Sequence, residues 1–192
     1  ANSDASIKTA EYLNEFIKNG YANLDPVKDE FLNGKAATLL GGSWNIADLE
    51  KSNLNWGVSY FPVADDGKAA SPTGDWAAAI TRDSKNPDAA GKFLQWAMNS
   101  DNIASYASAV AKPASRTSSY EKMEGWDSGA RALMKWQLQN TGVSRPRTPS
   151  YSVLSTDFST AMLNIFAGAD AKEELDNVAK NFDENYEMYY KK

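Results

Sequence analysis

Residues 31–44 read FLNGKAATLLGGSW, a stretch in which helix and strand patterns follow one another closely. Its first two residues supply the buried face of a short helix over residues 25–34, which begins with Asp-Pro and ends at glycine. The apolar run over residues 36–40 stops at a glycine pair and predicts a short buried strand. Helical spacing returns over residues 44–49. A strand between two helices indicates a fold that mixes both kinds of element.

Outward from this stretch, two further strands are predicted. Residues 54–61 alternate between apolar and polar side chains, and residues 76–80 form a short run of small and apolar residues. Helical spacing and capping residues predict helices over residues 3–20, 87–97, 100–111 and 150–167 and from Asp170 onward, with broken helical pieces over 123–138. Residues 142–149 contain two prolines and form a loop that presents two guanidinium groups. Few short strands among many helices indicate an α/β or α+β fold.

The composition is that of a globular chain with an acidic balance. Its 192 residues suit one large domain or two small ones, and 42% hydrophobic residues are enough to bury a core. Twenty Lys and Arg against twenty-five Asp and Glu give a net charge of −5. A negative chain does not neutralise phosphates, so we expect no nucleic acid partner. The longest apolar stretches are far shorter than a membrane span of about 20 residues, so we expect a soluble chain.

The chain contains no histidine and no cysteine. Their absence excludes histidine-relayed serine nucleophiles, cysteine nucleophiles, zinc sites of the His/Cys type and thiol redox chemistry. An enzyme mechanism would have to rest on carboxylates or lysines, and a metal site on oxygen ligands. Asp65 and Asp66 lack the alternating oxygen ligands of a calcium loop. We therefore expect no metal site.

Two of the six tryptophans follow small residues at the ends of predicted strands. Trp44 comes directly after Gly-Gly-Ser and Trp76 after Gly-Asp, and small residues let a ligand approach the backbone beside a large ring. A pyranose ring stacks its apolar face on indole, while its hydroxyls need carboxylate, amide and guanidinium partners. Asp75, Asn45 and Arg145 carry such groups, which is consistent with a sugar site. A tryptophan is more often a packing residue, and that alternative stays open at this point.

A set of short motifs spans nearly the whole sequence in a fixed order. They are FLNGKAA at residues 31–37, GSW at 42–44, WGV at 56–58 with Pro62, Gly74, SKNP at 84–87 leading into residues 90–96, the loop 113–117, and Arg145-Pro146 with Pro149 and Tyr151. No single motif is specific, but their order and gaps together resemble the extracellular solute-binding proteins, the family that includes the maltose-binding protein.

The resemblance implies an α/β fold of the type II periplasmic-binding-protein kind, in which two lobes joined by hinge strands close on a ligand. It matches only the later part of the family's longer chains. We therefore expect a C-terminal fragment, in agreement with a sequence that begins without methionine and without a leader. Residues 1–75 and 119–192 would belong mainly to the second lobe, and residues 76–118 mainly to the first.

The resemblance also implies which residues bind and what they bind. It gives an aromatic sugar platform at Trp44 and further cleft positions at Asp75, Trp76, Arg116, Arg145 and Tyr151; Ser43 and Asn45, next to Trp44, complete the candidate site. The implied function is capture of a mono- or oligosaccharide by aromatic stacking and hinge closure, for delivery to the permease subunits of an ABC transporter. Leu154-Ser155-Thr156 stand where maltose-binding relatives place a large aromatic residue, which counts against maltose itself.

A binding subunit of this kind is not an enzyme and carries no metal or organic cofactor. It works outside the cytoplasm, either free in the periplasm or held at the bacterial surface by a lipid anchor. Residues 76–118 would have lost the sheet that covers their apolar residues. We therefore expect the 192 residues alone to oligomerise or to keep this segment mobile, and to bind sugar weakly.

Other classes of protein remain as alternatives. A carboxylate-based glycoside hydrolase or a carbohydrate-binding module would also use tryptophan platforms. A hydrolase needs two carboxyl groups about 5 to 9 Å apart across the sugar, and Asp75 is the only carboxyl among the candidate positions. A plain helical interaction domain would bind no sugar.

Overall fold

The computed structural model describes residues 1–25, 29–63, 67–74 and 76–190. The chain divides into two compact units, one formed by Ala1–Lys28 and Pro146–Lys192 and the other by Asp29–Arg145. Nearly all regular structure in the described residues is helical, and their strands are one pair of two residues each. The expectation of a helix-rich chain with few short strands is confirmed.

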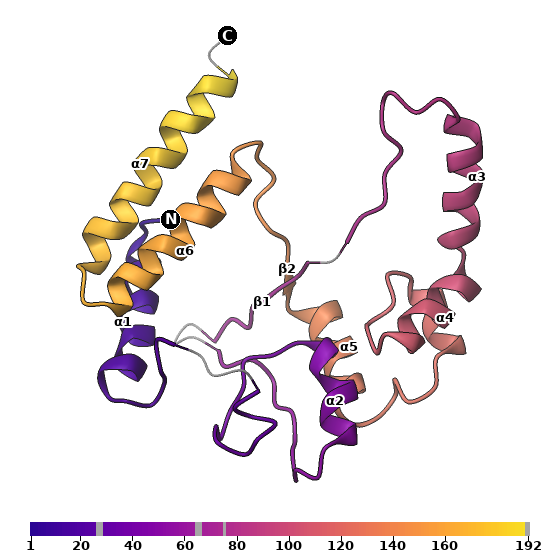
Figure 1. Ribbon diagram of the computed structural model, residues 1–192, viewed down its shortest axis with the longest axis horizontal. Helices are drawn as coiled ribbons and strands as arrows, with labels where there is room; N and C mark the ends of the chain where they lie inside the picture. The colour runs from indigo at the N-terminus through magenta and orange to yellow at the C-terminus, as the bar shows by residue number, and fades with distance from the viewer. Residues whose placement is uncertain (26–28, 64–66, 75, 191–192) are drawn as a thin grey trace. The chain divides into compact units, whose positions relative to one another are not determined.

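The first unit is built from α1 (Asp4–Lys18), α6 (Tyr151–Phe166) and α7 (Ala171–Tyr190), which pack against one another (Figure 1). Their buried core consists of Ala10, Ala161, Ile165, Ala171, Leu175 and Val178. All three helices lie where the 3.6-residue spacing of apolar side chains predicts them.

Side-chain caps begin two of these helices at the predicted residues. Ser3 Oγ accepts a hydrogen bond from the Ser6 N–H at 3.2 Å, which starts α1. Asp170 Oδ1 accepts one from the Glu173 N–H at 2.8 Å, which starts α7. Because each cap satisfies a backbone donor that the first turn leaves without a partner, the helix starts follow from local sequence.

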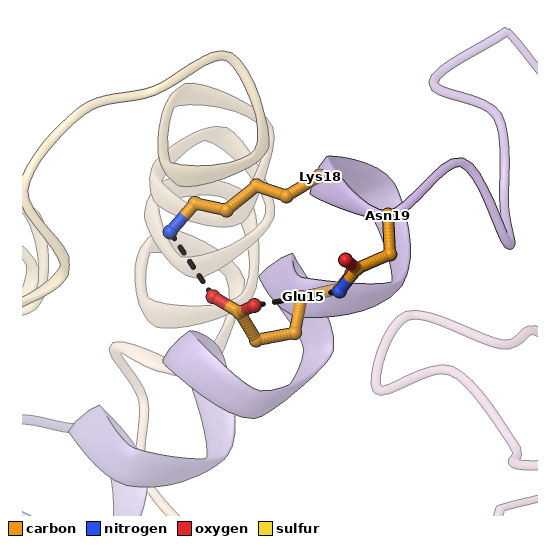
Figure 2. A network of polar contacts seen from close by, with 3 residues as sticks. All are labelled: Glu15, Lys18 and Asn19. Carbon is orange, nitrogen blue, oxygen red and sulfur yellow. Dashed lines mark hydrogen bonds and ion pairs between the residues drawn. The ribbon is translucent and has the colours of Figure 1, made fainter.

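The end of α1 is fixed by a small polar network (Figure 2). Lys18 Nζ lies 3.2 Å from Glu15 Oε1, and Asn19 Nδ2 lies 3.4 Å from Glu15 Oε2. Asn19 Nδ2 also donates to the Glu15 carbonyl oxygen at 2.7 Å. The Asn19 N–H donates to the same oxygen at 3.0 Å, so Asn19 binds the last turn through both its backbone and its side chain. Gly20 follows with a φ of 70°, a left-handed conformation that ends the helix.

The second unit holds the remaining helices of the described chain. They are η1 (Ser43–Asn45), α2 (Ile46–Lys51), α3 (Pro87–Ala97), α4 (Ser100–Ala109), η2 (Thr117–Lys122) and α5 (Gly129–Asn140). A core of Ile103, Ala104, Ala107, Ala114, Met123 and Trp126 lies between α4 and the segment after it. Trp126 is 2% exposed and is therefore a packing residue. Ser119 Oγ donates to the Ser100 carbonyl oxygen at 2.9 Å and joins η2 to the start of α4.

An ion pair links α2 to α5. Both nitrogens of the Arg131 fork contact the Glu50 carboxylate, with Nη2 2.8 Å from Oε2. The hydrogen bond from Arg131 holds the pKa of Glu50 below its ordinary value of 4.5. Because the pKa of Glu50 is lowered in the folded state, the pair stabilises the fold fully at pH values above the ordinary pKa of Glu50. The stabilisation is lost as the pH falls through the folded-state pKa. Both side chains are partly exposed, so the contribution stays below about 1 kcal/mol.

The strands β1 (Ser71–Pro72) and β2 (Gly142–Val143) pair in parallel, residue for residue in that order. The pairing continues past β1, because the Thr73 N–H and Oγ1 donate to the Val143 carbonyl oxygen at 3.0 and 3.1 Å. These two residues are 70 positions apart in the sequence. The pair therefore ties together the two ends of the segment that contains α3, α4, η2 and α5.

The strands predicted over residues 36–40, 54–61 and 76–80 are wrong. No described residue pairs with these segments in a strand ladder. A strand needs a second strand for its hydrogen bonds, and an apolar pattern does not reveal whether that partner is present. The alternation over residues 54–61 still agrees with side-chain burial. Residues 54, 56 and 58 are half-buried, and residues 55, 57 and 59 are exposed.

A cavity of about 490 Å³ lies between two of these unpaired segments, residues 36–40 and 54–61. Residues 36–42 and 54–62 form most of its lining, and α5 adds Met134 and Gln137. Two of the three segments predicted as strands thus line a cavity, and Leu40 remains 75% exposed.

Two helix predictions need smaller corrections. Of the short helix expected over residues 25–34, residues 26–28 lie outside the described residues, and residues 29–34 form turns that end at Gly34 with a φ of 67°. Of the broken helical pieces expected over 123–138, residues 123–128 are not helical, and the rest belongs to the continuous helix α5, which begins at Gly129. The positive φ values of Asp29 and Gly34 lie outside the right-handed helical region, so a regular helix cannot run through either residue.

We expect Gly142→Ala to lower the free energy of unfolding by about 1 to 3 kcal/mol. A Cβ at this position would lie 2.6 Å from the Leu138 carbonyl oxygen and 2.8 Å from Thr73 Cγ2, so β2 would have to move away from β1. Urea unfolding measures the change.

Gly57→Ala is the matched control, because its new Cβ would have no neighbouring atom within 4 Å and its φ is not left-handed. The control should change the free energy of unfolding by less than about 0.5 kcal/mol. Equal unfolding midpoints for the two variants would contradict the role given to Gly142.

Candidate functional site

Three predicted site residues lie together on η1, namely Ser43, Trp44 and Asn45. Trp44 is 65% exposed, whereas Ser43 is buried. A Cβ on Gly42 would lie 2.3 Å from Cη2 and Cζ3 of the Trp44 indole, so the ring lies back over the glycine backbone. The sequence suggested that small residues admit a ligand here; the structure shows that Gly42 admits the indole ring itself.

Asn45 holds the turn that carries Trp44. Its Oδ1 accepts a hydrogen bond from the Gly42 N–H at 3.1 Å. The same oxygen would lie 2.6 Å from a Cβ on Gly41, so the close approach needs a glycine there. The Asn45 amide oxygen, which was expected to bind a sugar hydroxyl, therefore accepts a hydrogen bond within the turn instead. Gly41 and Gly42 are both required because a side chain at either position would clash with Asn45 or Trp44.

Arg145 lies against Gly74, beyond the paired strands. A Cβ on Gly74 would be 3.2 Å from Arg145 Nη2. Trp76, two residues after Gly74, is 91% exposed and provides a second large ring near the strand pair. Asp75, between Gly74 and Trp76, lies outside the described residues.

Arg116 lies at the start of η2 with an exposed side chain. The loop before it is held by Tyr120, whose hydroxyl oxygen accepts from the Ala114 N–H at 3.1 Å. Burial raises the pKa of Tyr120, and Lys135 Nζ lies 4.8 Å from the centre of its ring. The phenol therefore stays protonated at neutral pH and acts as a structural anchor for the Arg116 loop.

Tyr151 belongs to the first unit, where it is the first residue of α6. Its side chain is half-buried, and its N–H donates to the Thr148 carbonyl oxygen at 3.2 Å. The structure thus places Trp44 and its neighbours on one turn, and Arg145 against Gly74. Trp76 follows β1 by four residues, Arg116 directly precedes η2, and Tyr151 is in the other unit.

One polar cluster near β1 was not predicted. Ser71 Oγ accepts a hydrogen bond from Gln137 Nε2, and the Thr141 hydroxyl lies 3.4 Å from the same oxygen. Gln137 on α5 also lines the cavity described above. No sequence signal joins residues 66 and 70 positions apart, since only the strand pairing brings them together.

The chemistry of these residues is stacking and hydrogen bonding. The exposed indole rings of Trp44 and Trp76 offer flat apolar faces. The guanidinium groups of Arg116 and Arg145 offer hydrogen-bond donors. Across the described ranges, no group of three or more Asp and Glu residues is arranged to hold a metal ion. None of the described helices combines the length and apolar composition that a membrane crossing needs.

Comparison with known proteins gives one family and several relatives. A model of the family described as bacterial extracellular solute-binding protein matches residues 1–134. The maltodextrin-binding protein MdxE of Bacillus subtilis is 24% identical over 158 residues, which are 82% of this chain and 38% of the relative. A galactooligosaccharide-binding protein of the same species is 23% identical over 190 residues, covering 93% of this chain and 45% of the relative.

A solved structure shares the fold. The maltose-binding periplasmic protein MalE of Listeria monocytogenes, in complex with maltose, superposes on all of this chain with a TM-score of 0.73 and 21% sequence identity. The chain covers 52% of that structure and 38% to 45% of the two curated relatives, so it spans about half of their length or less.

We expect Gly42→Ala to displace the Trp44 indole, because the new Cβ would overlap two ring atoms. The indole is 65% exposed and lies outside the buried cores, so the free energy of unfolding should change by less than about 1 kcal/mol. The near-ultraviolet circular dichroism signal of Trp44 should change. In a Trp44→Ala background, Gly42→Ala should leave the spectrum as it is, and a spectrum unchanged in the wild-type background would refute the placement of the ring.

Proposed function

Because the chain belongs to the bacterial extracellular solute-binding proteins, we propose that it is part of the carbohydrate-binding subunit of an ABC importer. The family is extracellular by definition, in agreement with the expected location outside the cytoplasm. The curated relatives are longer than this chain, and the proposal concerns the whole protein, which we take to have their length.

The observation that carries the proposal is the exposed indole of Trp44 on a turn built to hold it. An exposed indole offers a flat apolar face on which a ligand can stack. Gly42 leaves space for the ring, and Asn45 fixes the turn through its hydrogen bond to the Gly42 N–H. A ring held in place loses little freedom when a ligand stacks on it, which favours tight binding.

The ligand that we propose is a mono- or oligosaccharide. Sugars present a flat C–H face to indole and hydroxyls to guanidinium groups, and both are offered here by Trp44, Trp76 and Arg145. The relatives are named for maltodextrin and for galactooligosaccharides, which supports a glycan longer than one unit. Arg116, Tyr151, Asp75 and Ser43 remain proposed members of the same site.

For the mechanism we propose capture by closure. Stacking and hydrogen bonds bind the sugar, two lobes close on it through hinge strands, and the closed form is delivered to the permease subunits of the importer. Residues 1–75 and 119–192 are assigned mainly to the second lobe and residues 76–118 mainly to the first.

The exposure of the apolar residues of α3 supports the assignment of residues 76–118 to the first lobe. None of the residues of α3, all of them described, is buried, and Phe93 and Trp96 are 61% and 60% exposed. An apolar helix face of this kind needs a covering surface. In the whole protein that surface would be the remainder of the first lobe, whereas the 192 residues alone would oligomerise or leave the segment mobile.

We expect Trp44→Ala in the whole protein to weaken sugar binding by about 1 to 3 kcal/mol without unfolding it. The loss follows from removing an exposed stacking surface that makes no contribution to the buried core. Calorimetric titration with a maltodextrin and a galactooligosaccharide measures the change. Trp126→Phe, in the buried core, is the contrasting variant, since it should lower stability and leave affinity nearly unchanged. An affinity unaffected by Trp44→Ala would make Trp44 a packing residue.

We also expect the protein to leave bound glycosides intact. Cleavage needs two opposed carboxyl groups, and Asp75 is the only carboxyl among the proposed site positions. A reducing-sugar assay over many hours, with each oligosaccharide that binds, tests this. Sugar release that disappears in Asp75→Asn would favour the glycoside hydrolase instead.

A further inference from the structure

The guanidinium group of Arg145 lies flat over Gly74. An ideal Cβ on Gly74 would be 3.2 Å from Nη2, 3.4 Å from Cζ and 3.4 Å from Nε. An approach from the edge of the group would leave Cζ clearly farther away than the two nitrogens. The similar distances mean that a Cβ on Gly74 would lie over the face of the guanidinium plane.

Gly74 is needed here for space and not for its backbone conformation. Its φ is not among the positive values found at other glycines of the chain, so any residue can adopt its conformation. A side chain at this position would press on the guanidinium group and tilt it or move it by a few tenths of an ångström. The glycine therefore leaves room for the guanidinium group in the position that it occupies.

The strand register explains why these two residues meet. Pro72 of β1 is paired with Val143 of β2, and two residues beyond this pair, on either strand, stand Gly74 and Arg145. Thr73 extends the pairing by donating to the Val143 carbonyl oxygen at 3.0 Å. In a parallel pair the register carries forward along both chains, so Arg145 is placed beside Gly74 by the backbone itself.

We propose that Gly74 is a positioning residue of the carbohydrate site, because its missing side chain orients the Arg145 guanidinium toward the hydroxyls of the bound sugar. The inference rests on the carbohydrate-binding function proposed above. A guanidinium group has five donors in a rigid fork, and its hydrogen bonds weaken steeply when their angles change. A small tilt therefore lowers affinity even though Arg145 is still present.

The test compares Gly74→Ala, Arg145→Lys and the double variant in the whole protein. Gly57→Ala is the control for adding a methyl group to a glycine without a left-handed φ. Titration calorimetry uses a maltodextrin and a galactooligosaccharide as probes. Gly74→Ala should weaken binding 3- to 10-fold and Arg145→Lys by a similar factor, while Gly57→Ala should leave affinity unchanged. A lysine has no planar fork for a Cβ to tilt, so Gly74→Ala should cause no further loss in the Arg145→Lys background.

A second measurement does not depend on sugar. The NMR signal of the Arg145 Nε–H group should shift in Gly74→Ala without ligand and stay in place in Gly57→Ala. An unmoved signal, an unchanged affinity, or losses that add fully in the double variant would overturn the role of Gly74. If the signal shifts but the wild-type protein binds neither sugar, the contact between Gly74 and Arg145 is confirmed. The proposed carbohydrate-binding function is then wrong, and so is the role of Gly74 in sugar binding.

Discussion

The parallel pairing of β1 with β2 is the constraint on which the second unit depends. It joins two segments 70 residues apart and turns the helices between them into one closed unit. The pair is short, and it needs Gly142, because the Leu138 carbonyl oxygen and the Thr73 methyl group fill the space that a side chain would take. Ser71 adds a second link through its hydrogen bond from Gln137 on α5. Few interactions thus hold a large loop closed, which makes each of them costly to lose.

The two best-defined parts of the candidate site use the same physical device. A flat side chain lies over a glycine that leaves room for it, with Trp44 on Gly42 and Arg145 near Gly74. The indole provides a stacking face and the guanidinium provides directed donors, and a sugar requires both. In both cases the glycine leaves open the space that a Cβ would take beside the flat group.

Much of the helical part of the fold is predictable from sequence, since its signals are local. Ser3 and Asp170 cap their helices as predicted, and Pro87 begins α3. The strands are not predictable in this way. Residues 36–40 have a strong strand pattern without a described partner, whereas the observed strands β1 and β2 contain proline and glycine, which strand preferences disfavour. Pairing depends on residues far apart in the sequence, and no local pattern records it.

The same distinction separates the parts of the candidate site. Trp44 is on a turn defined by Gly41, Gly42 and Asn45, so its position follows from consecutive residues and the sequence could indicate it. The position of Arg145 beside Gly74 follows from the strand register, and the sequence could identify only a loop with exposed guanidinium groups. Disturbing the strand pair would therefore displace the donors of Arg145 and leave the indole of Trp44 in place. The proposed stacking and hydrogen-bonding parts of the candidate site depend on different elements of the fold, so they can vary independently of each other.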